Sequence, residues 1–171
     1  IENSTIPVTI TPINLKNIKH FFNRPKAKKH STEFSISRFL TPYLSNYKGY
    51  SLYLDCDFVM LGDVGKLFKF ILKQSYKTVW CVKHTDYIPK DKIKFLREKQ
   101  LPYAKKNWSS FIVYNCEHPS NKNLTAELVN SETGAFLHQF KWLKDSEIGA
   151  LDERWNWLEG WTSNHNSNTP Y

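Results

Sequence analysis

The sequence predicts an α/β domain with a mostly parallel central sheet, and three observations lead to this prediction. Segments of β-forming residues alternate with segments of helical periodicity along the chain, an order typical of α/β sandwiches. Residues 50–54 are apolar almost throughout, as expected for a central strand with both faces buried. Residues 64–72 carry apolar side chains at helical spacing. The chain has 171 residues, which is the size of one domain.

The elements are expected in a definite order. Residues 6–10 predict a strand, and Ser31 or Thr32 is placed to cap a helix through Leu40 that Pro42 ends. Asp63 is the expected cap of the helix after strand 50–54. Its apolar stripe consists of Val64, Leu67, Phe68, Ile71 and Leu72. The further expected elements are strands at 78–82 and 111–114 and helices at 125–129 and 134–143.

The polar, aperiodic end of the chain sets the expected domain boundary. Asn, Ser, Thr and Pro dominate residues 163–171, a composition that favours disorder. We therefore expect one domain over residues 1–162, followed by a flexible tail over 163–171.

Basic residues outnumber acidic ones, 24 Lys and Arg against 16 Asp and Glu, which gives a net charge of +8. This balance favours an anionic partner, such as nucleic acid, a membrane surface or a phosphorylated small molecule. No nucleic-acid-recognition motif is present, and no apolar run approaches the roughly 20 residues of a transmembrane helix. We therefore expect no transmembrane segment and no nucleic-acid partner.

The three cysteines predict a reducing environment. Cys56, Cys81 and Cys116 each lie within an apolar, strand-like run, where buried thiols are expected. Their number and spacing fit neither a disulfide framework nor a zinc site. We therefore expect a cytoplasmic protein with reduced cysteines.

Two aspartates directly after the buried strand form the most informative motif. Asp55 and Asp57 are separated by one residue, so in an extended chain they point to the same side while Cys56 turns into the core. Ligands of open α/β sheets gather beyond the carboxyl ends of strands. Carboxylates there suit Mg²⁺ or Mn²⁺, which also bind phosphate oxygens. The motif therefore predicts a metal site that holds a diphosphate.

Further motifs surround this pair in a defined order. Arg38-Phe39-Leu40-Thr41-Pro42 precedes it, and Leu61-Gly62-Asp63-Val64 follows it. Downstream blocks include Lys106-Asn107-Trp108-Ser109-Ser110, Tyr114-Asn115-Cys116 and Trp155-Asn156-Trp157-Leu158. In this order the blocks resemble nucleotide-sugar-dependent glycosyltransferases, in particular bacterial proteins similar to glycosyltransferase family 8. The resemblance covers about residues 4–161.

The resemblance implies an A-type glycosyltransferase fold, with a Rossmann-like sheet that binds a nucleoside diphosphate sugar through Mn²⁺ or Mg²⁺. It implies a metal-dependent enzyme that transfers the sugar to an acceptor such as a glycan, with a UDP-sugar donor favoured by analogy. Asp55 and Asp57 are then the metal ligands. Arg38 matches an arginine of the helix before the motif, where its planar fork suits a phosphate or orients Asp55. The resemblance identifies no catalytic residue.

Polar residues around the strand 111–114 are candidates for binding the sugar. Period-two alternation places Asn107, Ser109 and Asn115 on one face. Their amide and hydroxyl groups suit sugar hydroxyls, and turn or capping roles are equally open.

A histidine and a group of tryptophans are open to two interpretations each. His84 follows a strand, either as a base, metal ligand or sugar contact, or as a surface loop residue. Trp155, Trp157 and Trp161 form either an acceptor platform or part of the core.

Two rival functions start from the same residues. A haloacid-dehalogenase-like phosphatase would use Asp55 as nucleophile, although Phe58-Val59 stands where Gly-Thr is usual. A non-enzymatic module that binds nucleic acid is compatible with the charge alone.

The resemblance also predicts a domain truncated at both ends. No base-binding strand precedes Ile1. The family's C-terminal metal-binding histidine segment has no counterpart around His165.

Overall fold

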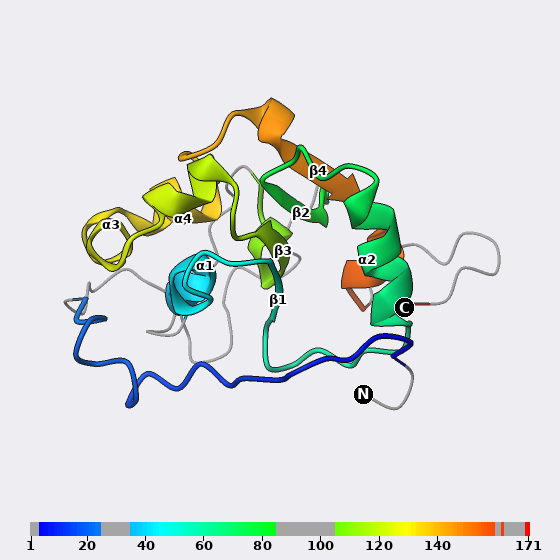
Figure 1. The fold of residues 1–171 in the computed structure, drawn as a ribbon, viewed down its shortest axis with the longest axis horizontal. Coiled ribbons are helices and arrows are strands. Elements are labelled where there is room, and N and C mark those ends of the chain that lie inside the picture. Colours follow the sequence, from blue (N-terminus) through cyan, green and yellow to red (C-terminus); the bar gives the residue numbers. More distant parts are fainter. Residues whose placement is uncertain (1–3, 25–34, 85–104, 160–161, 163–169) are drawn as a thin grey trace.

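The computed structural model describes residues 4–24, 35–84, 105–159, 162 and 170–171, and it forms one small α/β unit (Figure 1). Its strands are β1 (Tyr50–Leu54), β2 (Val79–Val82), β3 (Phe111–Asn115) and β4 (Ile148–Leu151). Its α-helices are α1 (Thr41–Leu44), α2 (Val64–Leu72), α3 (Ala126–Ser131) and α4 (Gly134–His138). Short 3₁₀ helices connect them: η2 (Ser37–Leu40), η3 (Trp108–Ser110), η4 (Pro119–Asn123), η5 (Asp145–Glu147) and η6 (Glu153–Asn156).

The sheet is mixed and mostly antiparallel, so the prediction of a Rossmann-like, mostly parallel sheet is wrong. The strand order is β1-β3-β2-β4. β3 is antiparallel to both β1 and β2, and only β2 and β4 are parallel. Among the described residues β1 is an edge strand, whereas the sequence predicted it to be central. Its apolar run shows that both faces are covered, but it carries no information on which strands lie beside it.

The side chains of β1 show how an edge strand comes to be apolar on both faces. Tyr50, Leu52 and Leu54 pack against the cluster that contains helix α2, and Tyr53 packs against the cluster on the opposite face. All five residues of β1 are partly buried. In contrast, every residue of β2 is fully or almost fully buried.

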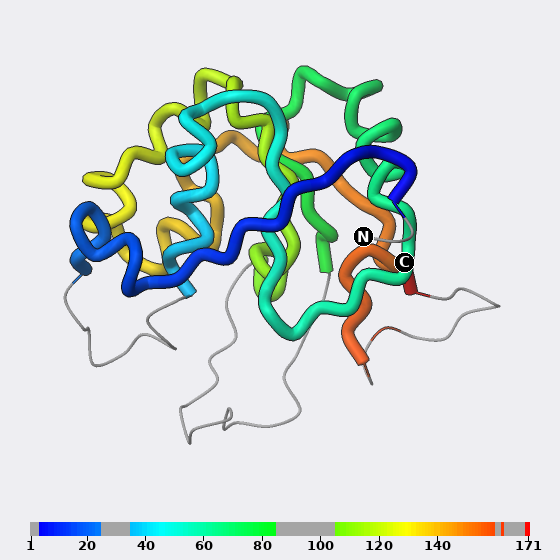
Figure 2. Tube along the Cα trace, turned by 60° about the horizontal axis from the view of Figure 1, so that its bottom comes forward, coloured from blue at the N-terminus to red at the C-terminus, as the bar shows by residue number. Residues whose placement is uncertain are grey.

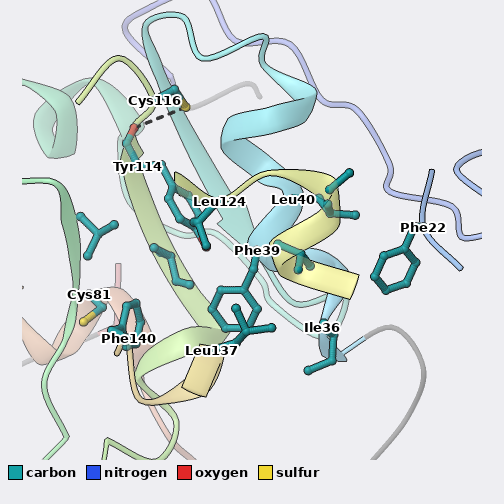
Figure 3. Packing of buried hydrophobic residues seen from close by; sticks show 14 of the residues in the cluster. Phe22, Ile36, Phe39, Leu40, Cys81, Tyr114, Cys116, Leu124, Leu137 and Phe140 are labelled. Carbon is teal, nitrogen blue, oxygen red and sulfur yellow. Dashed lines mark hydrogen bonds between the residues drawn. The ribbon is translucent and has the colours of Figure 1, made fainter. Parts of the chain in front are cut away.

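The core lies on both faces of the sheet. On one face, Phe39, Leu40, Leu137 and Phe140 from the helical side pack against β2, β3 and β4, as Figure 3 shows in part. On the other face, Leu67 and Ile71 of α2 pack against Trp80, and Trp155 joins this cluster. Figure 1 shows the same division, with α1, α3 and α4 on one side of the sheet and α2 on the other. The core interpretation of Trp155 is thereby confirmed.

Helix α2 matches the sequence prediction most closely. It spans Val64–Leu72, and the side chain of Asp63 accepts a hydrogen bond from the Gly65 N–H as its N-cap. Leu67 and Ile71 are completely buried. Leu72, however, is 57% exposed, so it does not belong to the packed stripe.

Other elements depart from the prediction. Residues 6–10 form no strand, and β4 was not predicted. Pro42 does not end a helix but lies in the first turn of α1, where its missing N–H costs nothing. The residues 31–34 expected to start that helix lie outside the described residues. Most of the expected tail, residues 163–169, also lies outside the described residues. Tyr171 at its end is described, and its ring packs on Trp155 with 4.7 Å between ring centroids.

The segment formed by residues 4–24 runs across the molecule (Figure 2). Near its start, the Thr5 N–H and hydroxyl donate to the Asp63 carboxylate at the beginning of α2. Near its end, Arg24 Nη1 donates to the carbonyls of Val129, Asn130 and Glu132 around the end of α3. The segment therefore connects the helices on the two faces of the sheet. No helix among the described residues is long and apolar enough to cross a membrane.

Candidate functional site at one edge of the sheet

One edge of the sheet gathers the ends of three strands. Because β1 and β2 are both antiparallel to β3, and β4 is parallel to β2, strands β1, β2 and β4 all run in one direction. Their carboxyl ends therefore meet the amino end of β3. We call this end of the strands, which is distinct from the edge strands of the sheet, the polar edge. It is formed by Asp55, Asp57, His84, Asn107, Ser109 and Asn156, which follow β1, β2 and β4 or precede β3.

Arg38 and Asp55 form a paired contact at this edge. Nη2 of Arg38 lies 2.9 Å from Oδ1 of Asp55, and Nη1 donates to Oδ2 at 3.3 Å. The same guanidinium donates from Nε to the Ser35 carbonyl at 2.7 Å and from Nη1 to the Ser109 carbonyl at 2.6 Å. Arg38 is only 6% exposed. Its guanidinium is therefore bonded inside the protein, and it links η2 to the end of β1 and to η3.

Tyr53 holds the same carboxylate from the strand. Its hydroxyl donates to Oδ1 of Asp55 at 2.9 Å, and the Arg38 guanidinium lies 5.1 Å from the centre of its ring. Burial raises the pKa of Asp55, and the charge of Asp57 adds to this, while Arg38 and the Tyr53 hydrogen bond act in the opposite direction. The net shift is upward. Both oxygens of Asp55 thus have protein partners, so Asp55 is a positioned group rather than a free ligand.

Asp57 lies differently from its neighbour. The chain turns after Leu54 instead of continuing as a strand, and the Phe58 N–H donates to the Asp55 carbonyl at 3.3 Å. As a result, Asp57 and Cys56 are both exposed. The expected burial of Cys56 is wrong, because extended-chain alternation ends where the turn begins. Cys81 and Cys116 are buried free thiols, as predicted.

Residues before β3 complete one side of the edge. Asn107 has a left-handed backbone with φ of 64°, and η3 rather than a strand follows it. The Ser109 hydroxyl is hydrogen-bonded to Nδ1 of His138 at 2.8 Å. Asn115 is not brought to this site, because it pairs with Tyr50 at the opposite end of β1 and donates to the Ser75 carbonyl at 3.1 Å.

Two further side chains at the polar edge have buried polar atoms without a partner. Asn156 is fully buried, and its Nδ2 donates to the Asn107 carbonyl at 3.1 Å and to the Ser110 hydroxyl at 3.0 Å, while its Oδ1 has none. Nε2 of His84 is likewise unpartnered, and burial lowers the pKa of His84 to about 4. The position of Asn156 between two tryptophans was the only sequence signal for its burial.

Two lysines lie over the ring of Trp108, which is bonded to the backbone after β2. Trp108 of η3 donates from its indole N–H to the His84 carbonyl at 3.0 Å. The ammonium groups of Lys83 and Lys105 lie 5.7 and 5.6 Å from the centre of its ring. Lys105 also pairs with the exposed Asp145. Lys83 in turn donates to the Ile148 carbonyl at 2.9 Å, so both ammonium groups are bonded near the start of β4. The polar edge therefore combines carboxylates with neutral hydrogen-bonding groups.

Within the part of the chain that the structure describes, no group of three or more His, Cys, Asp or Glu side chains is placed to hold a metal ion. Asp55 and Asp57 are two carboxylates, one of them already paired. A protein-built metal cage is therefore not present among these residues.

Fold and site together define a small α/β domain with a mixed four-stranded sheet and a polar edge built around a buried arginine–aspartate pair. The chain is similar to Protein CDI of Arabidopsis thaliana, with 48% identity over 161 residues. The match covers 93% of this chain and 61% of that protein, so the chain spans about six tenths of its relative's length. No protein family model matches the chain, and no solved structure matches it.

These findings correct the identification suggested by the sequence blocks. No glycosyltransferase family matches, and the similar curated protein carries a different name. The sheet is mixed rather than Rossmann-like, and the described residues contain no metal-binding cluster. The resemblance to family 8 and the assignment of sugar transfer are therefore wrong. The phosphatase alternative also fits poorly, because both oxygens of Asp55 have partners.

Proposed function

We propose that the polar edge binds a nucleoside diphosphate compound, including its sugar conjugates, together with Mg²⁺ or Mn²⁺. The observation that carries this proposal is the exposed carboxylate of Asp57 beside the fixed Arg38–Asp55 pair, beyond the carboxyl end of β1. A diphosphate needs positive charge, and a carboxylate beside it needs a cation between them. A bound Mg²⁺ or Mn²⁺ supplies the positive charge for both.

The donor set fits a cation that shares its coordination with the ligand. Mg²⁺ is usually held by one or two carboxylates, several waters and substrate phosphates, rather than by a cage of protein groups. Asp57 can supply such a carboxylate, and Asp55 lies close enough for the charge of Asp57 to raise its pKa. This explains how a site without three clustered ligands can still take a metal, provided that the phosphates arrive with it.

The neutral groups of the edge suit the uncharged part of such a ligand. Oδ1 of Asn156 and Nε2 of His84 are buried without a partner, so a hydroxyl or amide group gains a hydrogen bond from them where binding opens the edge to it. Trp108 offers an aromatic face beside the two lysines. These contacts favour a ligand with polar and planar parts in addition to phosphate.

Thermal unfolding with and without ligand tests this function. Nucleoside diphosphates and their sugar conjugates are added with Mn²⁺, because a ligand that binds the folded state raises its stability by RT ln(1 + [L]/Kd). We expect the melting temperature to rise only when metal and nucleotide are both present. Asp57→Asn should lose the rise, while the matched control Glu127→Gln, on α3, should keep it. A rise that Asp57→Asn retains would contradict the proposal.

We propose in addition that the chain is part of a metal-dependent enzyme that acts on this ligand. The supporting feature is the presence at one edge of two titratable groups with shifted pKa values, raised for Asp55 and lowered for His84, because such groups are common at catalytic sites. Phosphorus NMR of the bound nucleotide compound with Mg²⁺ tests it. New phosphorus signals are expected, and an unchanged spectrum of the fully bound ligand would contradict enzymatic activity.

A cytoplasmic location stays a proposal as well. It is supported by the three free cysteines, two of them buried, because thiols persist in reducing compartments. Imaging of a tagged full-length protein tests it, and localisation to a secretory compartment would contradict it.

A further inference from the structure

The outward face of α2 combines positive charge with exposed apolar side chains. Lys66, Lys69 and Lys73 are all exposed, and their spacing of three and four residues places them on one side of the helix. Leu67 and Ile71, on the opposite side, are completely buried against the sheet. We call the exposed side, formed by Lys66, Lys69, Phe70 and Lys73, the α2 lysine face. Figure 1 shows α2 on the outside of the molecule.

Large apolar residues lie among these lysines. Phe70 is 42% exposed, Leu72 57% and Leu61, just before the helix, 55%. Leu61, Lys66 and Phe70 all line one surface hollow of about 630 Å³, which also includes Trp155. Each apolar group left in water forgoes the free energy of burial. A partner that buries them while attracting the lysines would recover it.

The acidic groups beside this face are bonded elsewhere. Two acids line the hollow, Asp63 and Asp152. Asp63 accepts hydrogen bonds from Thr5 and from the Gly65 N–H, and its charge interacts with Lys66. Asp152 binds Arg154 at 2.8 Å. Leu67 and Ile71 of α2 are completely buried against the sheet, and the lysines take no part in that packing. With three lysines against the charge of Asp63, the face keeps a net positive charge, in line with the net charge of +8.

We propose that the α2 lysine face docks on an anionic membrane surface, with the lysines at the lipid head groups and Phe70 and Leu61 at the boundary with the acyl chains. Basic side chains near an anionic leaflet are attracted to it, and aromatic rings settle at the interface. A nucleic-acid backbone would pair with the lysines but would leave the aliphatic Leu61 in water. The combination therefore favours lipid. This binding is peripheral and is separate from the polar edge.

Vesicle sedimentation with the whole chain tests the proposal. Vesicles contain phosphatidylcholine alone or phosphatidylcholine with phosphatidylserine. We expect binding only with phosphatidylserine, and release at high salt, because salt screens exposed charges. The triple variant Lys66→Gln, Lys69→Gln, Lys73→Gln should weaken binding by about fivefold for each lysine, or about a hundredfold in total.

Matched variants distinguish binding through this face from a general effect of the net charge. Lys48→Gln, Lys122→Gln, Lys141→Gln removes the same charge from exposed lysines outside α2, and it should bind almost as the unchanged protein does. Phe70→Ala should also weaken binding, whereas Ile10→Ala, at a residue 72% exposed in the N-terminal segment, should not. Circular dichroism checks that each variant is folded.

Several outcomes would overturn the proposal. An equal loss of vesicle binding in the two triple-lysine variants would show that binding depends on net charge and not on the α2 lysine face. Equal binding to both kinds of vesicle, or to neither, would exclude anionic lipid as the partner. A gel shift with nucleic acid that only the α2 triple abolishes, without vesicle binding, would assign the face to nucleic acid instead.

Discussion

The guanidinium of Arg38 holds the carboxylate of Asp55 through two contacts, Nη2 to Oδ1 at 2.9 Å and Nη1 to Oδ2 at 3.3 Å. The two residues come from η2 and the end of β1, and the same arginine also binds the backbone before β3. A single buried side chain thus fixes three segments at the polar edge. Asp57, two residues further along the chain, is therefore the exposed carboxylate of the motif.

Removing the arginine should destabilise the fold strongly. Arg38→Met leaves the half-buried Asp55 without its counter-charge, and breaking a buried pair typically costs about 3–5 kcal/mol. Chemical denaturation measures the free energy of unfolding. The matched control is Arg154→Met, which breaks the exposed contact with Asp152 and should leave stability unchanged. Equal stability of the Arg38→Met variant and the unchanged protein would contradict the structural role of the pair.

The burial of His84 makes stability depend on pH. Burial lowers the pKa of His84 from 6.5 to about 4, so the unfolded chain takes up the proton at a higher pH than the folded one. Stability is therefore fully present above pH 6.5 and is lost as the pH falls toward about 4. Because the ring is partly solvated, we expect a loss of about 1–3 kcal/mol from this group.

The difference between the unchanged protein and His84→Gln isolates this effect. Free energies of unfolding are measured for both proteins at a series of pH values from 6.5 down to 4. The stability of the variant should decline less steeply over that range. Parallel curves for the two proteins would contradict the assignment to His84.

Two leucines of α2 give a prediction with an internal control. Leu67 is completely buried and Leu72 is 57% exposed. Leu67→Ala should lower the free energy of unfolding by about 2–5 kcal/mol, since it removes packed methyl groups and leaves a cavity. Leu72→Ala should stay within about 0.5 kcal/mol of the unchanged protein. Similar losses for the two variants would show that the buried face of α2 is misplaced.

The sequence was most informative where structure is local. Helix α2 follows from its spacing and from Asp63, a cap that acts within one turn. The order of the strands depends on pairing between distant segments, for which the sequence holds no local signal. The apolar run of β1 therefore suggested a central strand, whereas it pairs with β3 alone among the described strands.

The site was predictable in part for the same reason. The position of Asp55 and Asp57 beyond a strand follows from their place in the chain. Arg38 was expected either to reach a phosphate or to orient Asp55, and in the structure it binds Asp55. Their relative orientation was not predictable, because a turn replaces the extended chain after Leu54. Asn115 was grouped with Asn107 by alternation, but η3 interrupts the strand period before Phe111.

Calorimetric titration of Mn²⁺ into the chain, with and without UDP, tests the central claim that Asp57 at the polar edge binds a metal together with a diphosphate. The account predicts that each ligand tightens the binding of the other, because the metal bridges the carboxylate and the phosphates, and that Asp57→Asn abolishes this coupling in a folded protein. Equal Mn²⁺ affinity with and without UDP, or unchanged coupling in Asp57→Asn, would contradict it.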